Sequence, residues 1–480
     1  MSTAARPSFA TRSAPARSSL APWTLFGADC LALEISFLLG LAVRQLLGNW
    51  FTASIGLDQY LAVAAGILLL PIINYQLGLY RGYLLGPVER LRRRTLATLA
   101  VFGGLVAWDH LVARGVLSRG VLLATLLCAL VLPPLAESFA RWALIRRGRW
   151  GVPVVILGAG ATGRSLAHML QSEPDFGLQP VAFFDNRPDT WHSSVSNVPV
   201  AGPLGLASDY SHRAHAAIVC LSDLDQADLG ALLHELDFSR VIIVPDLAGF
   251  ANLWVTARPL GDFLGLELKK NLLLPRNHVL KTMMDQAITL PVFILSIPFV
   301  ALAAVWIRLT TGGPAFYRQF REGQHGKPIP VWKLRTMHTD GDRILEEWFQ
   351  NHPEDREHWQ RFFKLPHDPR LLPVIGSLLR RTSLDELPQL WSVLRGEMSL
   401  VGPRPLPEYH VRQLPDDFRA LRSRVPPGIT GLWQVSARGD GEIKVQEALD
   451  TFYIRNWSPW LDLYILARTV TAVALARGAY

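Results

Sequence analysis

The stretch Arg380-Arg381-Thr382-Ser383-Leu384-Asp385-Glu386-Leu387-Pro388-Gln389-Leu390-Trp391 sets two adjacent carboxylates beside basic residues at the start of an apolar pattern. The apolar side chains recur at the spacing of one helical face, which continues to Leu394. Gly396 is predicted to end that helix. Pro388 has no N–H and fits only in a first helical turn. The pattern therefore predicts Asp385 and Glu386 at a helix N-terminus, where free N–H groups favour anions.

Two kinds of role are open to this acidic pair. Arginine binds phosphate oxygens bidentately, and Arg380 precedes the pair while Arg404 follows it in Pro403-Arg404-Pro405. A carboxylate among such cations either attacks a phosphorus atom or holds a metal that bridges a diphosphate. The alternative is structural, because Ser383-x-x-Glu386 is also the pattern of a capping box.

Several ordered runs between residues 281 and 480 resemble the signature of the bacterial sugar transferases, the monotopic phosphoglycosyl transferases that act on polyprenyl phosphates. The matching runs are Arg380 with residues 383–389, then 396–405 and 427–435. The resemblance implies transfer of a hexose 1-phosphate from a UDP-sugar to undecaprenyl phosphate, which yields an undecaprenyl diphosphate sugar and UMP. This is the first membrane step of exopolysaccharide, O-antigen or capsule synthesis.

The choice of sugar rests on the ends of the chain. The long N-terminal extension and the last residues, 477–480, resemble the undecaprenyl-phosphate galactose phosphotransferases, which favours UDP-galactose. UDP-glucose or an N-acetylated UDP-sugar is an open alternative, because one epimer changes few contacts. A different class of function is a non-catalytic membrane regulator or scaffold of polysaccharide assembly. The intact acidic pair with Arg380 and Arg404 favours the enzyme.

The resemblance also implies roles for individual side chains. Asp385 would attack the β-phosphorus and form a covalent aspartyl phospho-sugar, and the helix N-terminus would keep it ionised. Glu386 would bind Mg²⁺, since hard cations prefer carboxylate and phosphate oxygens. Contacts to substrate phosphate and nucleotide are expected from Arg380, Arg404, Lys333, Arg335, Pro403, Pro405, Gln434, Asp450 and Asp462. Packing, helix capping or solvated charge is the alternative for Lys333, Arg335, Gln434 and the two late acids.

Composition and charge indicate a membrane protein with two or three domains. The 480-residue chain is 50% hydrophobic, carries a formal net charge of +8, and gathers its apolar residues in blocks. A basic balance in such a chain fits the positive-inside rule and attraction to anionic lipid. No nucleic-acid module is visible, so nucleic acid is not an expected partner. The three cysteines lie far apart, which predicts reduced, buried thiols.

Four hydrophobic segments predict a four-helix transmembrane domain over residues 21–148, after a basic, flexible arm over residues 1–20. The segments are 23–47, 59–80, 96–116 and 119–140, each near the ~20 residues that cross a bilayer. Arginines before the first segment, between the second and third, and after the fourth place both ends in the cytoplasm. Asp29 lies within a span and is expected to pair with another helix or to snorkel to the interface, with a functional role as the alternative.

Residues 149–265 carry the pattern of a small Rossmann-like domain. A strand over residues 152–157 runs into Gly158-Ala-Gly160-Ala-Thr-Gly163, a helix follows, and a second strand ends at Asp185. Glycines at this spacing, with an acid after the second strand, form the dinucleotide-binding fingerprint. The domain either binds a nucleotide or nucleotide-sugar through Gly158, Gly160, Gly163 and Asp185, or it is a scaffold without a ligand.

A linker over residues 266–280 leads to a catalytic domain over residues 281–480, which begins with a membrane segment. A full crossing by residues 286–307 would place the catalytic half outside, away from cytoplasmic UDP-sugars. Pro298 removes a helical hydrogen bond and kinks the helix. In the resembling family a Ser-Pro pair makes the break, whereas this sequence has Ile297-Pro298 with Ser296 one place earlier. We therefore expect a re-entrant helix–break–helix over residues 281–308, as the resemblance implies.

The expected whole is a membrane protein of mixed α and α/β class. It combines the four-helix bundle, the Rossmann-like domain and an α-rich catalytic domain on the cytoplasmic face of the bacterial inner membrane. Inner-membrane lipid, the UDP-sugar donor and the undecaprenyl phosphate acceptor are the expected partners, and a homodimer is a further expectation.

Overall fold

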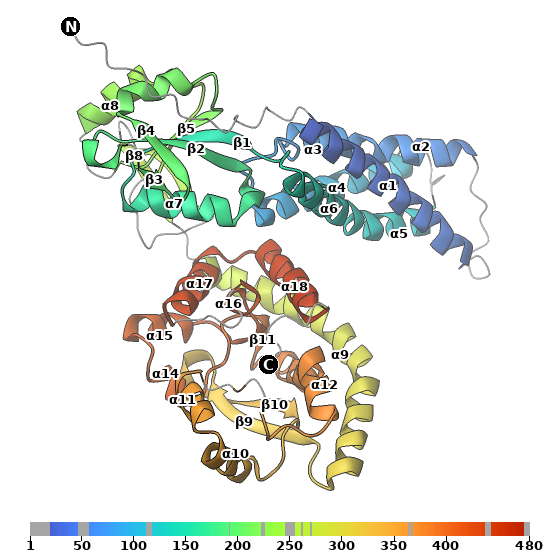
Figure 1. Cartoon of the computed structure of the whole chain (residues 1–480). Helices are drawn as coiled ribbons and strands as arrows, with labels where there is room; N and C mark the ends of the chain where they lie inside the picture. The colour runs from blue at the N-terminus through green and yellow to red at the C-terminus, as the bar shows by residue number, and fades with distance from the viewer. Residues whose placement is uncertain are drawn as a thin grey trace. The chain divides into compact units, whose positions relative to one another are not determined.

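The computed structural model describes residues 20–46, 57–111, 118–191, 193–221, 226–244, 255–260, 263–268, 271–362, 365, 368–436 and 443–474. The chain divides into two compact units, Met1–Leu247 and Ala248–Tyr480. Unit 1 contains apolar helices and a mostly parallel sheet, and unit 2 contains a long apolar helix (Figure 1). The acidic pair also belongs to unit 2.

The first part of unit 1 is helical. Side chains from the first five helices share one apolar core that includes Phe37, Ile67 and Phe102. The predicted hydrophobic segments correspond in order to α1, to α2 with α3, to α4, and to α5 with α6. The bounds are α1 (Leu20–Leu46), α2 (Leu57–Ile67), α3 (Leu69–Gln76), α4 (Pro87–Leu111), α5 (Arg119–Ala129) and α6 (Leu132–Arg146).

Among the described residues, three helical stretches are long and apolar enough to cross a membrane: Leu20–Leu46, Arg119–Arg146 and Pro275–Thr311. The stretch Val63–Gln76 is apolar but shorter. Helix α4 begins at Pro87, earlier than expected, because proline suits a first turn and Glu89 pairs with arginines three and four residues on. The helix thereby takes in basic residues that were expected in a loop. That all four segments cross the membrane stays a prediction.

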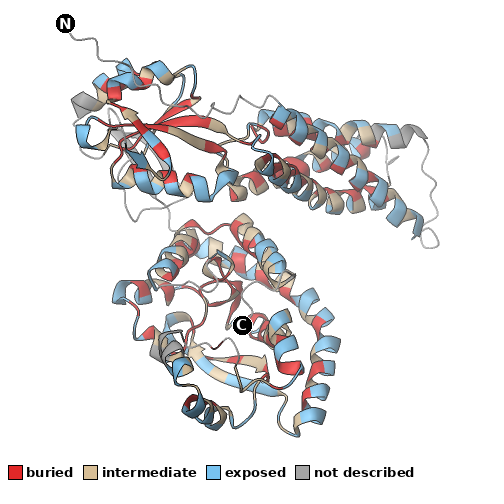
Figure 2. Ribbon diagram, in the orientation of Figure 1, coloured by how far each residue is buried: buried red, intermediate tan, exposed pale blue. Residues whose placement is uncertain are grey.

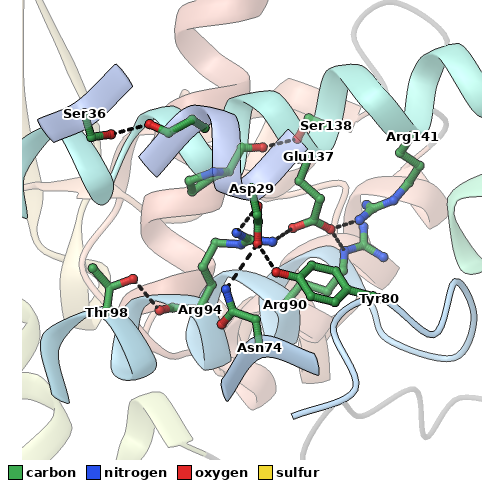
Figure 3. A network of polar contacts seen from close by, with 12 residues as sticks. Asp29, Ser36, Asn74, Tyr80, Arg90, Arg94, Thr98, Glu137, Ser138 and Arg141 are labelled. Carbon is green, nitrogen blue, oxygen red and sulfur yellow. Dashed lines mark hydrogen bonds and ion pairs between the residues drawn. The ribbon is translucent and has the colours of Figure 1, made fainter. Parts of the chain in front are cut away.

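Buried charges join the helices of unit 1 (Figure 3). Arg94 of α4 contacts Asp29 of α1 and Glu137 of α6, each at 2.6 Å, and all three are buried. A buried charge is tolerated when it is paired and hydrogen-bonded, so the expectation that Asp29 pairs across helices is confirmed. We call this cluster the α1–α4–α6 charge network, and its other members are Asn74, Tyr80, Arg90 and Arg141.

The second part of unit 1 is a sheet with strand order β3-β4-β2-β1-β5-β6. All neighbours are parallel except β3 and β4. The central strands are apolar and buried on both faces (Figure 2), as expected of a parallel sheet covered on both sides. The predicted strand over residues 152–157 is confirmed. The strands are β1 (Val152–Leu157), β2 (Leu178–Phe184), β3 (Ser194–Val195), β4 (Val198–Gly202), β5 (Ala216–Val219) and β6 (Val241–Ile243).

Helices and short 3₁₀ turns connect these strands. They are α7 (Ala161–Ser172), η1 (Pro174–Phe176), η2 (Pro188–Thr190), η3 (Leu204–Tyr210) and α8 (Gln226–Glu235). The strand order and crossover helices are those of a Rossmann-like fold, so this part of the predicted fold is confirmed.

The loop between α3 and α4 contacts the amino end of β1 and β2. The N–H of Leu84 donates to the carbonyl of Phe176 (3.1 Å), and Tyr83 Oη lies 2.9 Å from His215 Nε2. Gly82 and Gly177 pass so closely that a Cβ on Gly177 would collide with the Gly82 carbonyl. Helices and sheet of unit 1 are thus joined at the strand ends opposite to the glycine loop.

Unit 2 is built around helix α9 (Pro275–Thr311) and two small sheets. Strands β9 (Phe316–Glu322) and β10 (Pro328–Leu334) form an antiparallel hairpin, and β11 (Ser399–Val401) and β12 (Gly428–Thr430) form a parallel pair. A further hairpin, β7 (Val255–Leu260) with β8 (Phe263–Leu268), precedes α9.

The remaining elements of unit 2 are short. The helices are α10 (Gly341–Asn351), α11 (Pro353–Phe362), α12 (Ile375–Thr382), α13 (Leu390–Leu394), α14 (Glu408–Val411), α15 (Asp416–Arg422), α16 (Leu432–Ser436), α17 (Ile443–Asn456) and α18 (Pro459–Ala474). The 3₁₀ turns are η4 (Asn271–Leu273), η5 (Gln324–Gly326) and η6 (Leu384–Gln389).

Helix α9 is continuous through Pro291 and Pro298, and Figure 1 shows it changing direction along its length. The Ser296 hydroxyl donates to the carbonyl of Phe293 (2.7 Å), just before Pro298. A proline inside a helix removes one backbone bond and bends the helix without ending it. The expected break is therefore a bend within one helix, and the re-entrant path stays a prediction.

Candidate active site

The acidic pair lies in the 3₁₀ turn η6 and not at the start of an α-helix, which corrects the expectation. Ser383 has a positive φ of 55°, makes no side-chain cap bond, and separates α12 from η6. The α-helix α13 begins only at Leu390 and ends at Leu394, close to the predicted stop at Gly396. The physical reason lies in Pro388, which lacks an N–H and disfavours α-helical geometry in the residue before it. The capping box is not formed.

Glu386 faces cations from two other elements. Lys333 Nζ of β10 lies 2.7 Å from Glu386 Oε1, and Arg404 Nη2 lies 3.8 Å from the same oxygen. These three side chains line a small cavity whose excess positive charge suits a diphosphate. The other lining residues are Arg321, Val331, Gln389, Pro405 and Ile429.

The two acids have different proton affinities. Burial and the charge of Glu386 raise the pKa of Asp385 to about 6, although Lys333 and Arg380 oppose the shift. Burial acts in the same direction on Glu386, but Lys333 and Arg404 outweigh it and lower the pKa of Glu386 to about 2. At neutral pH both acids are therefore ionised, Asp385 by a narrow margin. Neighbouring cations, and not a helix N-terminus, favour the ionised form of Asp385.

Arg380 of α12 also acts on the acidic pair. Its Nε donates to Thr336 Oγ1 at 3.2 Å, and its charge interacts with Asp368 and Asp385. Burial lowers the pKa of Arg380 while these two carboxylates raise it. Arg380 stands outside the cavity lining, so the structure brings it near Asp385 and not into the group around Glu386.

Strands β11 and β12 position the run Pro403-Arg404-Pro405. The N–H of Gly402 donates to the carbonyl of Thr430 (2.8 Å), and the N–H of Gly428 donates to that of Pro403 (2.9 Å). A Cβ on Gly428 would collide with the Gly402 backbone, so the close approach requires glycine there. This packing carries Arg404 and Pro405 to the cavity.

Two predicted contact residues, Arg335 and Gln434, do not line the cavity. Arg335 donates to the Thr311 hydroxyl at the end of α9. The amide of Gln434 donates to the carbonyl of Ile429 (3.1 Å) and so supports β12, whose Ile429 does line the cavity. Their expected contacts with substrate stay predictions.

The two late acids are buried in ion pairs. Asp450 of α17 lies 3.7 Å from Arg422 of α15. Asp462 of α18 is fully buried and accepts from Lys281 of α9 (2.7 Å) and Tyr453 (2.8 Å). Neither acid belongs to the cavity lining, and each joins two helices of unit 2. Helix capping, the alternative for these acids, does not describe them.

Sequence reasoning missed two polar residues of the lining, Arg321 and Gln389. The register of the β9–β10 hairpin pairs Arg321 with Ile329 and Gln319 with Val331. Residues that alternate along a strand share a face, so Arg321 faces the same side as Lys333. Pairing the two segments as a hairpin with period two would have identified Arg321. Gln389 stands within the acidic stretch itself and was overlooked as part of the expected helix.

The glycine loop of unit 1 follows β1 as predicted. Gly158 has a φ of 105°, and a Cβ on Gly163 would collide with the Gly158 carbonyl, so local packing explains both glycines. A Cβ on Gly160 would meet no atom of the described residues within 4 Å. Asp185 accepts from the N–H of Ala159 (2.8 Å) and from Arg187 (3.0 Å). The nucleotide and scaffold alternatives both stay open.

The acidic pair has donors that suit a cation shared with a substrate. Among the described residues, no group of three or more His, Cys, Asp and Glu side chains forms a metal site. Mg²⁺ commonly binds one or two carboxylates and completes its shell with phosphate oxygens and water. Repulsion between Glu386 and Asp385, which raises the pKa of Asp385, is what a shared cation would relieve. The oxygen donors present therefore fit Mg²⁺.

A long apolar helix with a cationic cavity and an acidic pair defines a class of membrane-associated enzymes that act on phosphorylated substrates. The chain belongs to the bacterial sugar transferase family, whose model matches residues 276–476. A second family model, described as a CoA-binding domain, matches residues 76–245.

Three relatives illustrate the similarity. The undecaprenyl-phosphate galactose phosphotransferase of Salmonella typhimurium is 32% identical over 395 residues, which cover 81% of each chain. The UDP-glucose:undecaprenyl-phosphate glucose-1-phosphate transferase of Escherichia coli is 32% identical over 340 residues, 68% of each chain. The exopolysaccharide production protein ExoY of Sinorhizobium fredii is 42% identical over 206 residues, which cover 43% of this chain and 90% of the relative.

Proposed function

We propose that the protein transfers a hexose 1-phosphate from a UDP-sugar to undecaprenyl phosphate, with galactose as the sugar. The observation that carries the proposal is the buried Asp385, which stands next in sequence to Glu386, while Glu386 lines a cavity together with Lys333 and Arg404. The names of the Salmonella and Escherichia relatives support the reaction class. Galactose rests on the first of these, and the second keeps glucose as the alternative sugar.

The proposed reaction has two displacement steps at one phosphorus atom. A carboxylate oxygen of Asp385 attacks the β-phosphorus, the bond from that phosphorus to the bridging oxygen breaks, and UMP leaves with the bond's electron pair. An oxygen of undecaprenyl phosphate then attacks the aspartyl phospho-sugar and releases the carboxylate. One phosphoanhydride replaces another, so positioning and charge neutralisation supply the catalysis. Arg404 and Lys333 neutralise the donor phosphates, and Arg380 acts beside Asp385.

Glu386 would hold Mg²⁺, which when bound supplies charge stabilisation to the diphosphate oxygens. Glu386→Gln should then raise the Mg²⁺ concentration that gives half-maximal activity by about tenfold. The measurement is a Mg²⁺ titration of UMP release, with Glu408→Gln, a surface carboxylate of the same unit, as control. An unchanged midpoint in Glu386→Gln would remove Glu386 as a metal ligand.

The first test is UMP release from purified protein with undecaprenyl phosphate, Mg²⁺ and one UDP-sugar at a time. UDP-galactose alone should support release, and UDP-glucose and UDP-N-acetylglucosamine are the competing donors. Asp385→Asn should abolish turnover and the covalent adduct, which intact-protein mass spectrometry detects. A folded sample that releases no UMP with any of these donors contradicts the reaction and favours the regulator.

For the membrane, we propose an inner-membrane protein whose helix α9 enters and leaves on the cytoplasmic face. The apolar surface of α9, its bend and its two prolines support this path. A cysteine placed at Ala301 or Arg308, in a variant without native cysteines, should resist a periplasmic thiol label. Labelling of Arg308→Cys from the periplasm alone would exclude the re-entrant path.

A further inference from the structure

The position of the Arg404 guanidinium depends on the contacts that fix the backbone of residues 402–405. Glycine packing and strand hydrogen bonds fix Gly402 and Pro403, as described above. The next carbonyls are held by side chains, because Arg422 Nη2 donates to the Arg404 carbonyl (2.5 Å) and Arg321 Nη1 donates to that of Pro405 (2.8 Å). Arg321 lines the cavity, whereas Arg422 does not.

Arg422 is itself held from behind by Asp450. Their side chains are 5% and 3% exposed, and Arg422 Nη1 lies 3.7 Å from Asp450 Oδ2. The two residues come from α15 and α17, so the pair joins two helices to one backbone carbonyl. Asp450 is buried and stands outside the cavity lining.

A buried ion pair is a poor way to gain stability alone, since apolar residues of similar volume often stabilise a fold as well or better. Arginine offers something that an apolar residue cannot, because its guanidinium donates a hydrogen bond to the Arg404 carbonyl while it faces a carboxylate at ion-pair distance. The Asp450 carboxylate balances the charge of the guanidinium in a buried site. Burial raises the pKa of Asp450 to about 6, and Arg422 opposes that shift.

We propose that Arg422 and Asp450 are positioning residues for the transfer reaction, which act by fixing the backbone of Arg404 and thereby its guanidinium at the donor diphosphate. This deepens the proposed function and rests on it in taking Arg404 as a phosphate ligand. It also assigns Asp450 an indirect role, in place of the direct substrate contact expected from the sequence.

The test is a double-mutant cycle between Asp450→Asn and Arg404→Ala, with kcat and KM for UMP release and UDP affinity by calorimetry. Asp450→Asn should lower kcat/KM and UDP affinity about tenfold in the wild-type background. In the Arg404→Ala background it should lower them less than twofold, because the guanidinium it positions is gone. Equal factors in both backgrounds would show that Asp450 acts independently of Arg404 and would overturn the proposal.

Two further variants keep the test decisive. If Asp450→Asn does not fold, the double variant Arg422→Met with Asp450→Leu removes the bond to the Arg404 carbonyl and replaces the pair by apolar volume. A folded double variant with wild-type kcat/KM and UDP affinity would overturn the proposal. Glu408→Gln, which breaks an exposed pair with Arg412, is the matched control and should change neither quantity.

The outcomes separate this inference from the proposed function. Wild-type protein that binds UDP but releases no UMP with any donor refutes the transfer reaction. The UDP-affinity cycle still decides whether Asp450 acts through Arg404.

Discussion

At the residue scale, Lys333 and Arg404 help to give the two neighbouring acids different pKa values, although burial alone would raise both. Both cations lower the pKa of Glu386, which is ionised at any pH near neutrality. Asp385 receives the repulsion of Glu386 and less compensation. A carboxylate that is less strongly paired with cations is the better nucleophile, while a carboxylate that stays ionised is suited to bind a metal cation. The pair thus divides into a reacting acid and a charge-holding acid.

The pH dependence of adduct formation follows from this division. The pKa of Asp385 is raised to about 6, so its ionised, reactive form is lost as the pH falls through that value. Single-turnover UMP release should fall below about pH 6 and level off above about pH 7. Glu386→Gln removes a negative neighbour and should move the acidic limb of the pH profile, in which UMP release falls, to lower pH. Lys333→Gln removes a positive neighbour and should move it to higher pH.

The opposite directions make this prediction sharp. A general loss of activity lowers the plateau in both variants without separating their limbs. Limbs that move together, or that stay fixed in both variants, would mean that a group other than Asp385 controls the profile.

At the scale of elements, the β11–β12 pair depends on contact between two backbones. Gly428→Ala places a Cβ against the Gly402 backbone, which cannot yield as a flexible side chain would. We expect a loss of about 1–3 kcal/mol in the free energy of unfolding of unit 2. UDP affinity should fall with it, since Arg404 follows β11, the strand that pairs with β12. Gly341→Ala, where a Cβ would meet only ordinary contacts, is the control for thermal unfolding. Equal stability of both variants would refute the packing argument.

The bend of α9 gives a second prediction at this scale. Pro298→Ala restores an N–H that can bond to the carbonyl of Ile294, so the helix should straighten. A straight helix favours a full crossing, and a cysteine at Arg308 should then become open to a periplasmic label. Pro291→Ala is the comparison, because the hydrogen bond of the Ser296 hydroxyl lies in the turn before Pro298 and so assigns the bend to Pro298. Identical labelling in both variants would place the bend under other control.

At the scale of the whole molecule, the two units correspond to separable matches. The match to ExoY covers 43% of this chain and 90% of that relative, and the sugar transferase model matches residues 276–476. We therefore expect a protein of residues 271–480 to fold and to release UMP in detergent. Comparison of its kcat/KM with that of the full chain would show what unit 1 contributes. An aggregated or inactive product would mean that unit 1 is required for the fold or the chemistry of unit 2.

Unit 1 should in turn depend on its charge network. Asp29→Asn leaves Arg94, Arg90 and Arg141 facing Glu137 alone, and an incompletely paired buried charge costs about 3–5 kcal/mol. Thermal unfolding in detergent should show this loss. Glu89→Gln breaks partly exposed pairs on α4 and should change stability by less than about 1 kcal/mol. Similar midpoints for both variants would mean that the network adds no stability.

The sequence predicted what depends on periodicity and ordered motifs. The strand over residues 152–157, the glycine loop and the acidic pair were found because apolar runs and fixed spacing determine them. The 3₁₀ turn of the pair was not, because it depends on the positive φ of Ser383 and on Pro388 acting together. The indirect place of Asp450 was also out of reach, because it depends on burial against a helix 28 residues away. Spacing within one segment carries no information about such a partner.

The close passage of Gly82 and Gly177 has a consequence for biosynthesis. Residue 82 leaves the ribosome about 95 residues before residue 177, a delay of roughly 5–20 s at common synthesis rates. The loop on which the sheet packs is therefore synthesised before the strands of the sheet that contact it. The α/β part therefore finishes folding while tethered beside the newly made helices, and errors of helix insertion would become errors of its assembly.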